Sequence, residues 1–236
     1  MKIRIGTSGF QYAEWKGGFY PEKLSLAKML AYYAGHFPTT EINYSFRQIP
    51  SEKTIARWAD ETPARFKFAF KAPQKVTHFS RLRDCGEIMA HFYQVVSALG
   101  DKLGPVLFQL PPDFNKDVPL LDDFLQSLPD DLKAALEFRH ESWFSDDLYT
   151  CLQTRHAALC LAESEDLTTP RIATTSFGYL RLRKVNYTPA ALRDWEKFIS
   201  QQTDRWKDTF IYFKHEDTGT GPVFAEKLRN VLPGSV

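Results

Sequence analysis

The stretch Ala134-Ala-Leu-Glu-Phe-Arg-His-Glu-Ser-Trp-Phe144 decides the fold, because an apolar strand in it runs directly into charged residues. Strand residues alternate between two faces, so Leu136 and Phe138 share one face while Glu137 and Arg139 share the other. If helices cover the outside of the sheet, the apolar face turns outward and the two charged side chains turn inward. Buried charges are costly unless they are paired. We therefore expect a site where this strand ends.

The composition indicates a folded protein without a dominant charge. The chain has 236 residues, of which 43% are hydrophobic and 14% aromatic, enough for a large core. The 30 Lys and Arg residues are balanced by 29 Asp and Glu residues, and the net charge of +1 gives no bulk attraction to nucleic acid or membrane. Cys85, Cys151 and Cys160 form no Cys-x-x-Cys pair, which is typical of buried thiols in a reducing compartment. No apolar run reaches membrane-spanning length. The sequence predicts a soluble cytoplasmic protein and leaves its oligomeric state open.

Strand-like and helix-like segments alternate along the chain. The predicted strands are Lys2–Gly6, Thr39–Asn43, Phe66–Ala72, Val106–Leu110, Ala134–Arg139, Ala157–Ala162, Gly178–Arg183 and Phe210–Lys214. The predicted helices are Leu24–Phe37, Glu52–Asp60, Glu87–Leu103, Pro119–Leu128, Asp146–Arg155, Pro189–Trp206 and Val223–Val231, whereas Glu163–Thr175 is expected to be mostly loop. Eight strands with intervening helices predict one α/β domain over residues 1–236, a (β/α)8 barrel of the TIM type. A doubly wound open sheet is the structural alternative.

The same alternation turns polar side chains inward on other strands. They include Glu41 and Asn43 on the second strand and Lys71 on the third. The remaining inward positions are Arg4, Ser8, Lys67, Gln109, Tyr179, Arg181, Arg183, Tyr212 and Lys214. Most of them lie at the carboxyl ends of strands, where barrel and open α/β enzymes carry their chemistry.

Motifs across the chain resemble one known family. They are Gly6-Thr-Ser-Gly-Phe-Gln-Tyr-Ala-Glu-Trp-Lys-Gly-Gly-Phe-Tyr-Pro21, Glu41-Ile-Asn43 with Ser45-Phe-Arg47 and Pro50-Ser51, Trp58 with Thr62-Pro63, Phe66–Ala72 with Pro73, Thr77 and His78, Phe108-Gln-Leu-Pro111, and Glu137-Phe-Arg-His-Glu-Ser-Trp-Phe144. Together they resemble the YecE-like proteins, a family named for a domain of unknown function. The resemblance implies a TIM barrel and no established reaction.

The C-terminal third departs from the pattern of that family. Arg181-Leu-Arg183-Lys184 stands where the family carries an Arg-x-His-Gly-like run, and Lys214-His215-Glu216-Asp217 stands where it carries an Asn-Asn-like pair. Both departures add positive charge to one side of the expected mouth, so the ligand of this member can differ from that of its relatives.

Glu41 and Glu137 are the leading catalytic candidates. They lie on the second and fifth strands, so their carboxylates can face each other across the mouth of a closed barrel. Paired carboxylates act as acid and base, or as nucleophile and acid, in glycosidases, at separations of roughly 6.5–9.5 Å or 5–5.5 Å. Alternatively, the two glutamates only neutralise Lys71, Arg139 and Arg181 in a buried network. Lys71 is the third catalytic candidate, because an amine in an apolar barrel can have a lowered pKa and form a Schiff base.

Inward basic side chains outnumber these glutamates, which predicts an anionic ligand such as a phosphate or a carboxylate. Lys71, Arg139, Arg181 and Lys214 are expected to bind it. Barrels often hold phosphate near their last two strands, where Arg181, Arg183 and Lys214 lie. Ser8 lies between glycines in a turn that suits an anion. The other predicted ligand-binding residues are Tyr12, Trp15, Asn43, His78, Gln109, His140 and Trp143. The aromatic ones either stack on a sugar or base ring or pack beneath the loops.

Neither a metal nor a cofactor is predicted. His78, His140 and His215 lie near strand ends, but no His-x-His or His-Glu-x-x-His spacing is present, and nearby cations repel a metal ion. The sequence predicts an enzyme, a hydrolase, lyase or isomerase, that uses acid–base chemistry on a small anionic metabolite, phosphorylated or sugar-like. A non-catalytic binding or sensor barrel is the second hypothesis. A nucleic-acid processing enzyme is the third, disfavoured by the near-zero net charge, so neither nucleic acid nor a membrane is an expected partner.

Overall fold

The chain folds into a closed barrel of parallel strands. The computed structural model describes residues 1–214, 219–232 and 234. The strands are β1 (Lys2–Ser8), β2 (Thr39–Ile42), β3 (Lys67–Lys71), β4 (Leu103–Gln109), β5 (Ala134–Glu137), β6 (Ala158–Glu163), β7 (Phe177–Leu182) and β8 (Asp208–Phe213), and they follow one another around the barrel in chain order. A ladder between β8 and β1 closes the ring. The prediction of a (β/α)8 barrel is confirmed, and the open sheet is excluded.

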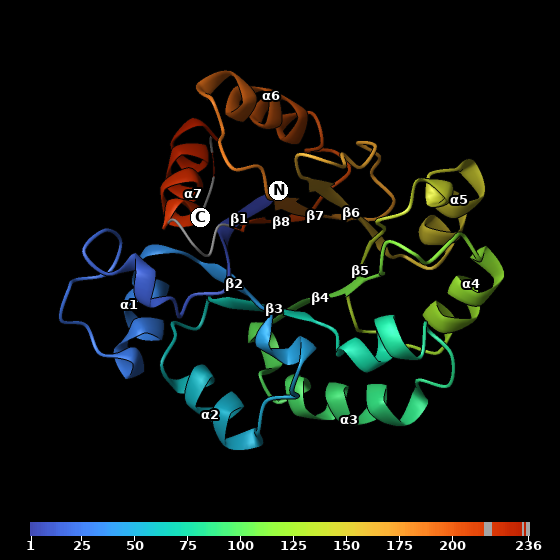
Figure 1. Ribbon diagram of the computed structural model, residues 1–236, viewed down its shortest axis with the longest axis horizontal. Coiled ribbons are helices and arrows are strands. Elements are labelled where there is room, and N and C mark those ends of the chain that lie inside the picture. The colour runs from blue at the N-terminus through green and yellow to red at the C-terminus, as the bar shows by residue number, and fades with distance from the viewer. Residues whose placement is uncertain (215–218, 233, 235–236) are drawn as a thin grey trace.

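Helices form an outer ring around the strands (Figure 1). They are α1 (Met29–His36), α2 (Glu52–Asp60), α3 (Gly86–Ser97), α4 (Val118–Gln126), α5 (Asp146–Thr154), α6 (Pro189–Ser200) and α7 (Thr220–Val231). Short helical turns are η1 (Ala13–Trp15), η2 (Leu26–Lys28), η3 (Tyr44–Phe46), η4 (Lys75–Phe79), η5 (Gly100–Lys102) and η6 (Glu141–Trp143). The connection between β6 and β7 is fully described and holds no helix, as predicted. No helix in the described part of the chain is long and apolar enough to cross a membrane.

Several helices are shorter than their sequence patterns predict. α1 begins at Met29 rather than Leu24, because the residues before it form the separate turn η2. α3 ends at Ser97 rather than Leu103, and Gly100 follows with a φ of +53°, which no regular helix contains. Apolar residues continue beyond both helix ends. Leu24 and Leu103 are partly buried against the outer core, whereas Leu26 in η2 is exposed.

Strand alternation divides the apolar residues into two layers. Leu136 and Phe138 join the outer core between strands and helices, whereas Ala135 belongs to an inner cluster. The inner cluster combines mostly small side chains on β3 to β6 with aromatic side chains on β7 and β8, namely Ala69, Leu107, Ala135, Ala158, Cys160, Ala162, Phe177, Tyr179, Phe210 and Tyr212. These residues fill the barrel interior, so the polar residues that follow them on the strands gather at the C-terminal end.

Gly6 is required where β1 passes β2, because a Cβ at this position would lie 2.0 Å from the Thr39 carbonyl oxygen. Gly6→Ala must push the two strands apart, and we expect it to lower the free energy of unfolding by about 1–3 kcal/mol, the scale of overpacking. Gly35→Ala on α1 is the matched control, since a Cβ there meets no atom within 4 Å. Urea unfolding compares the two variants. A Gly6→Ala protein as stable as the wild type would contradict the close strand approach.

Candidate functional site

The polar residues predicted to share a site come together at the C-terminal mouth of the barrel. Each follows a residue of the inner cluster by two positions on its strand: Lys71 after Ala69, Gln109 after Leu107, Glu137 after Ala135, and Arg181 after Tyr179. Because parallel barrel strands end at one face, this shared spacing brings the four side chains to a similar level.

Arg181 is the centre of the site. Its side chain is 1% exposed, and its guanidinium lies between the two glutamates. Nη2 donates a hydrogen bond to Glu41 Oε1 at 3.0 Å, and Nη1 donates to Glu137 Oε2. Burial disfavours the cation, but the two carboxylates outweigh burial and raise the pKa of Arg181 well above its usual value. This arginine therefore stays charged without contact with solvent.

Glu41 is fully buried and accepts hydrogen bonds from three side chains. Besides Arg181, the donors are the Ser8 hydroxyl at 2.5 Å and the Tyr179 hydroxyl at 2.6 Å. Asn43 Nδ2 donates in turn to Ser8 Oγ at 2.5 Å. Burial alone would raise the pKa of the Glu41 carboxyl, but Arg181 and the hydroxyl donors outweigh burial and lower this pKa below its usual value. Glu41 is a carboxylate at neutral pH.

Glu137 is equally buried and more strongly surrounded by cations. Its Oε1 accepts from Gln109 Nε2 at 2.7 Å and from Arg139 Nε at 3.1 Å, and Arg183 Nη1 lies 3.7 Å away. Burial raises the pKa of the carboxyl, but Arg181 and the other two arginines outweigh burial and lower this pKa to about 2. Both glutamates are therefore ionised over the physiological pH range.

The two carboxylates face each other across a guanidinium, not across an open gap. In a paired-carboxylate glycosidase the gap holds the scissile bond or a water molecule. Here Arg181 lies between Glu41 and Glu137, and neither glutamate holds a proton that it could donate at neutral pH. The geometry corrects the expectation of an open acid–base pair and favours the alternative of a buried network.

Lys71 is an amine whose pKa the site brings close to neutrality. Its Nζ donates to Gln109 Oε1 at 2.8 Å and lies 3.8 Å from the centroid of the Phe46 ring. Burial first, and Arg181 second, lower the pKa of Lys71 to about 7 against the opposing effect of the glutamates. Because Gln109 also donates to Glu137, its amide links the lysine to a carboxylate. An amine that is partly neutral at pH 7 can accept a proton or attack a carbonyl.

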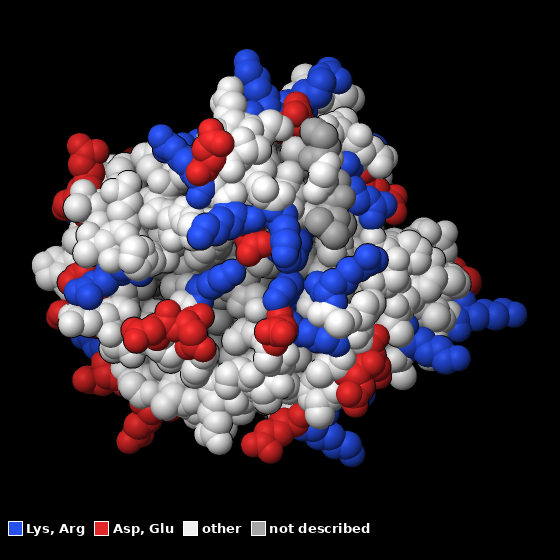
Figure 2. Space-filling view, turned by 180° about the vertical axis from the view of Figure 1, so that it is seen from behind, with Lys and Arg blue, Asp and Glu red and all other residues white. Residues whose placement is uncertain are grey.

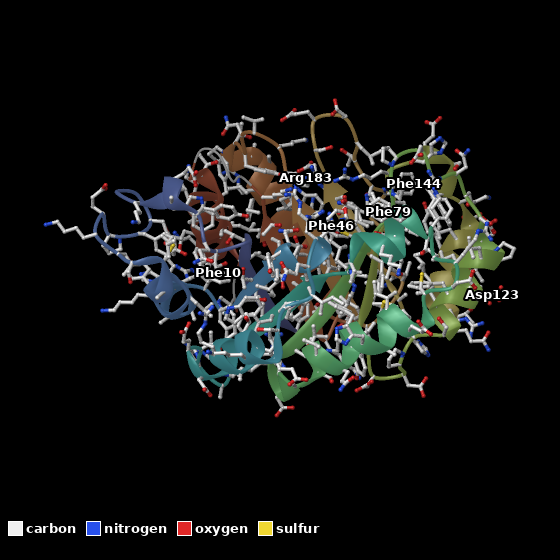
Figure 3. The ribbon with its side chains drawn as sticks, turned by 60° about the horizontal axis from the view of Figure 1, so that its bottom comes forward. Phe10, Phe46, Phe79, Asp123, Phe144 and Arg183 are labelled. Atoms are coloured by element: carbon white, nitrogen blue, oxygen red, sulfur yellow. The ribbon has the colours of Figure 1, made fainter. Side chains whose placement is uncertain are left out.

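Cationic side chains form the rim above this network. Arg139 and Arg183 are 30% and 27% exposed, so each contacts both Glu137 and solvent. Lys214 lies near enough to lower the pKa of Lys71 electrostatically. Figure 3 shows Arg183 toward the same end of the barrel as Phe46. With Lys71 and Arg181, these residues place five cationic side chains beside two carboxylates.

Two residues of β7 and its end extend the predicted site. Tyr179 donates to Glu41, although it was not among the predicted ligand-binding or catalytic residues. Arg183, which was expected near the phosphate position of the last two strands, pairs with Glu137. Strand alternation turns positions 179 and 183 inward together with Arg181, and this was the signal in the sequence for both residues. Lys184, the other cation by which this strand departs from the family pattern, turns instead to the buried Glu163 at 2.9 Å.

His78 and His140, the two histidines among the predicted ligand-binding residues, lie at the edge of the site. His78 Nδ1 is 2.8 Å from the Thr77 hydroxyl, and the His78 ring meets Phe46 edge-on at 4.9 Å. Burial, and then Lys71, lower the pKa of His78. His140 Nδ1 accepts a hydrogen bond from the backbone N–H of Ser142 at 3.2 Å and so caps η6. This contact gives His140 a structural role in the loop.

Trp15 and Trp143 lie in the core, at 2% and 0% exposure. The Trp143 indole donates to the Phe114 carbonyl at 2.7 Å, and its ring stacks on Phe138. Their burial favours the second of the two roles expected for these rings, packing beneath the loops after β1 and β5. Tyr12, by contrast, is only half-buried.

A cavity of about 350 Å³ adjoins the network on the side of β1 and β2. Tyr12 and Asn43 line this cavity, and both also contact Ser8, the Tyr12 hydroxyl donating to the Ser8 carbonyl at 2.9 Å. The remaining aromatic lining is Phe10, Tyr44 and Trp58. A molecule in this cavity would lie next to the hydrogen-bond donors of Glu41.

Among the described residues, no group of three His, Cys, Asp or Glu side chains is placed to hold a metal ion. His215, one of the three histidines considered, lies outside the described residues. That binding needs neither metal nor cofactor stays a prediction. The three cysteines are free and buried, as predicted.

Glu137→Gln leaves Arg139 and Arg183 without this counter-charge and Arg181 with Glu41 alone, and we expect it to lower the free energy of unfolding by about 3–5 kcal/mol. The pKa of about 2 in the folded protein lies below the value of about 4.3 for a free glutamate. The stabilisation from Glu137 is therefore complete above the unfolded pKa and is lost as the pH falls toward the folded pKa.

Urea unfolding as a function of pH measures both effects. The wild type should lose stability as Glu137 is protonated at acidic pH, and the variant should not show this part of the decrease. The exposed Glu87→Gln on α3 is the control and should change stability by no more than about 0.5 kcal/mol. If Glu137→Gln behaves like this control, the buried network does not stabilise the fold.

Comparisons with known sequences find proteins without an assigned activity. A family model described as "Protein of unknown function DUF72" matches residues 4–235. The UPF0759 protein YecE of Escherichia coli is 33% identical over 144 residues, which cover 61% of this chain and 50% of that protein. The match thus spans about half the length of that relative. The UPF0759 protein YunF of Bacillus subtilis is 28% identical over 269 aligned residues, with 98% of this chain and 94% of that protein covered.

Solved structures show the same barrel. A DUF72 family protein from Thermotoga maritima superposes with a TM-score of 0.84 at 25% identity and covers 98% of both chains. One from Enterococcus faecalis has a TM-score of 0.82 at 19% identity, covering 99% of this chain and 96% of that one, a likeness of fold alone. Since the family model matches nearly the whole length, this chain belongs to the DUF72 family, as its YecE-like motifs predicted.

Proposed function

We propose that this protein is an enzyme that uses acid–base chemistry on a small anionic metabolite at the C-terminal mouth. One observation supports this most. Lys71, whose pKa burial and Arg181 lower to about 7, lies 2.8 Å from Gln109 beneath a rim of cations. A general base is most effective when its pKa is close to the ambient pH.

In this proposal Lys71 accepts and returns the proton. Gln109 orients the amine and connects it to Glu137, whose carboxylate stabilises the ammonium that forms when Lys71 is protonated. Glu41 and Glu137 remain ionised throughout and hold Arg181 in position. They act as electrostatic and positioning residues rather than as proton donors.

The anion is bound by the rim. Among the described contacts, Arg139 contacts Glu137 through Nε, and Arg183 contacts Glu137 through Nη1. The other N–H groups of each guanidinium can therefore form bidentate hydrogen bonds to a phosphate or a carboxylate. Lys214 adds positive charge on the same side. The aromatic cavity beside Tyr12 and Asn43 is large enough for the sugar-like part of such a metabolite.

The arrangement fits some reaction classes better than others. Proton abstraction next to a carbonyl, the first step of many lyases and isomerases, needs a base of neutral pKa and an anion clamp. Hydrolysis by two carboxylates needs an open gap between them, and Arg181 fills that gap. We therefore favour lyase or isomerase chemistry.

A non-catalytic binding barrel is the second candidate. The observation that favours it is the saturation of both carboxylates, since Glu41 and Glu137 accept hydrogen bonds from three side chains each. A network of this kind can support a binding site without taking part in a reaction. The two candidates bind the same anions and differ only in turnover.

A thermal-shift panel of inorganic phosphate, sugar phosphates and carboxylates tests the binding half of the proposal. A ligand at a hundredfold excess over its Kd should raise the free energy of unfolding by about 2.7 kcal/mol. Arg139→Gln and Arg183→Gln should remove most of this gain, because each loses a charged fork. Lys75→Gln, exposed on the neighbouring turn η4, is the control and should keep it. Wild type that responds to no anion would contradict an anion site.

Lys71→Gln tests the catalytic half. Glutamine keeps a hydrogen-bond donor for Gln109 but cannot take up a proton, so the variant should retain the thermal shift while conversion of the bound anion falls by roughly 10²–10⁴-fold. NMR spectra of wild type with each stabilising anion measure conversion directly. Conversion should increase as the pH rises through about 7, where Lys71 loses its proton. Binding without conversion of any panel member would favour the binding barrel.

A further inference from the structure

The opposite end of the barrel, where the strands begin, also concentrates positive charge. Figure 2 views the side of the molecule opposite to Figure 1 and shows Lys and Arg side chains gathered at its centre around a few acidic side chains. A cavity of about 360 Å³ lies at this end. Its lining includes five cationic residues, Lys2, Arg4, Arg65, Lys67 and Lys133.

The counter-charge in this cavity is smaller than the positive charge. Its acidic lining consists of Asp101 and Asp208. Asp208 is shared, because Arg4 Nη1 lies 2.6 Å from Oδ1 and Lys133 Nζ lies 3.4 Å from Oδ2. Lys67 donates to the backbone carbonyl of Asp101 rather than to its carboxylate. One carboxylate thus serves two cations, and Lys67 is bound to a neutral oxygen.

The cationic side chains of the cavity repel one another. Burial lowers the pKa of Lys67 first, and the charges of Arg4 and Lys133 lower it further, against a smaller opposing effect of the aspartates. The chain as a whole carries a net charge of only +1, so this concentration is local. A bound anion would relieve the repulsion between these side chains.

We propose that this cavity is a second anion-binding site, which takes a phosphate-bearing ligand with at least two negative charges. Arginine and lysine together form the donor set that recognises phosphate oxygens. The Phe210 ring lies 5.3 Å from the Arg4 guanidinium and supports it from one side. The volume lies within the range of small-ligand pockets, about 300–1,000 Å³, and exceeds what inorganic phosphate alone requires.

The second site is physically separate from the mouth. Strand β3 carries Lys67 at its first residue and Lys71 at its last, a distance of roughly 13 Å along the strand. The inner cluster fills the barrel between the two ends. One small anion cannot contact both lysines, so this inference does not rest on the function proposed for the mouth.

Isothermal titration with pyrophosphate tests the proposal, at constant low ionic strength because salt screens the interaction. Arg65→Gln and Lys67→Gln should each raise the Kd by about tenfold, the effect of one lost charge-assisted hydrogen bond. Both are titrated in the Arg139→Gln background, which weakens anion binding at the mouth, and the exposed Lys53→Gln on α2 is the matched control that should leave this Kd unchanged. Since Arg65 is exposed, its variant remains informative if Lys67→Gln fails to fold.

Protection from acetic anhydride locates the anion independently. Pyrophosphate should slow the acetylation of Lys67 and Lys133, measured by mass spectrometry of peptides, and should leave Lys53 unaffected. Weaker binding in the cavity variants together with this protection supports the site. Cavity variants that bind like their Arg139→Gln parent, or a parent that binds no pyrophosphate, would overturn it.

Discussion

The buried contact of one guanidinium with two carboxylates is the interaction on which the candidate site depends. Arg181, Glu41 and Glu137 lie on β7, β2 and β5, and each side chain is at most 1% exposed. Any one of these charges alone at this depth would be strongly destabilising. The three are tolerated because they neutralise one another and because hydroxyl and amide donors satisfy the remaining oxygens. The contact therefore links three separate strands and holds them in register at the mouth.

The same contact determines the chemistry of its neighbours. It occupies both glutamates, so the cations around them are only partly neutralised. Lys71 lies beside this contact, and its pKa falls to about 7 through burial and the proximity of Arg181, against the opposing effect of the glutamates. In the function that we propose, Arg181 therefore acts twice, in the network that stabilises the barrel and on the pKa of the amine that transfers the proton.

Positive charge is concentrated at both ends of a barrel whose total charge is close to zero. At the mouth the cations surround buried glutamates, whereas at the other end they surround a shared Asp208. Small side chains and the rings of Tyr179, Phe210 and Tyr212 separate the two ends. Among DUF72 relatives the fold is common.

The sequence by itself determined the features that depend on neighbouring positions along a strand. Alternation placed Leu136 outward and Glu137 inward, and repeated strands and helices predicted the closed barrel, because the pleat of a strand is a local property. Only the tertiary structure decided that Arg181 fills the space between the carboxylates, that Trp143 turns to the Phe114 carbonyl, and that Lys67 and Lys133 share a cavity. These contacts join residues far apart in the chain. Their geometry follows from barrel closure and side-chain packing, which no single segment specifies.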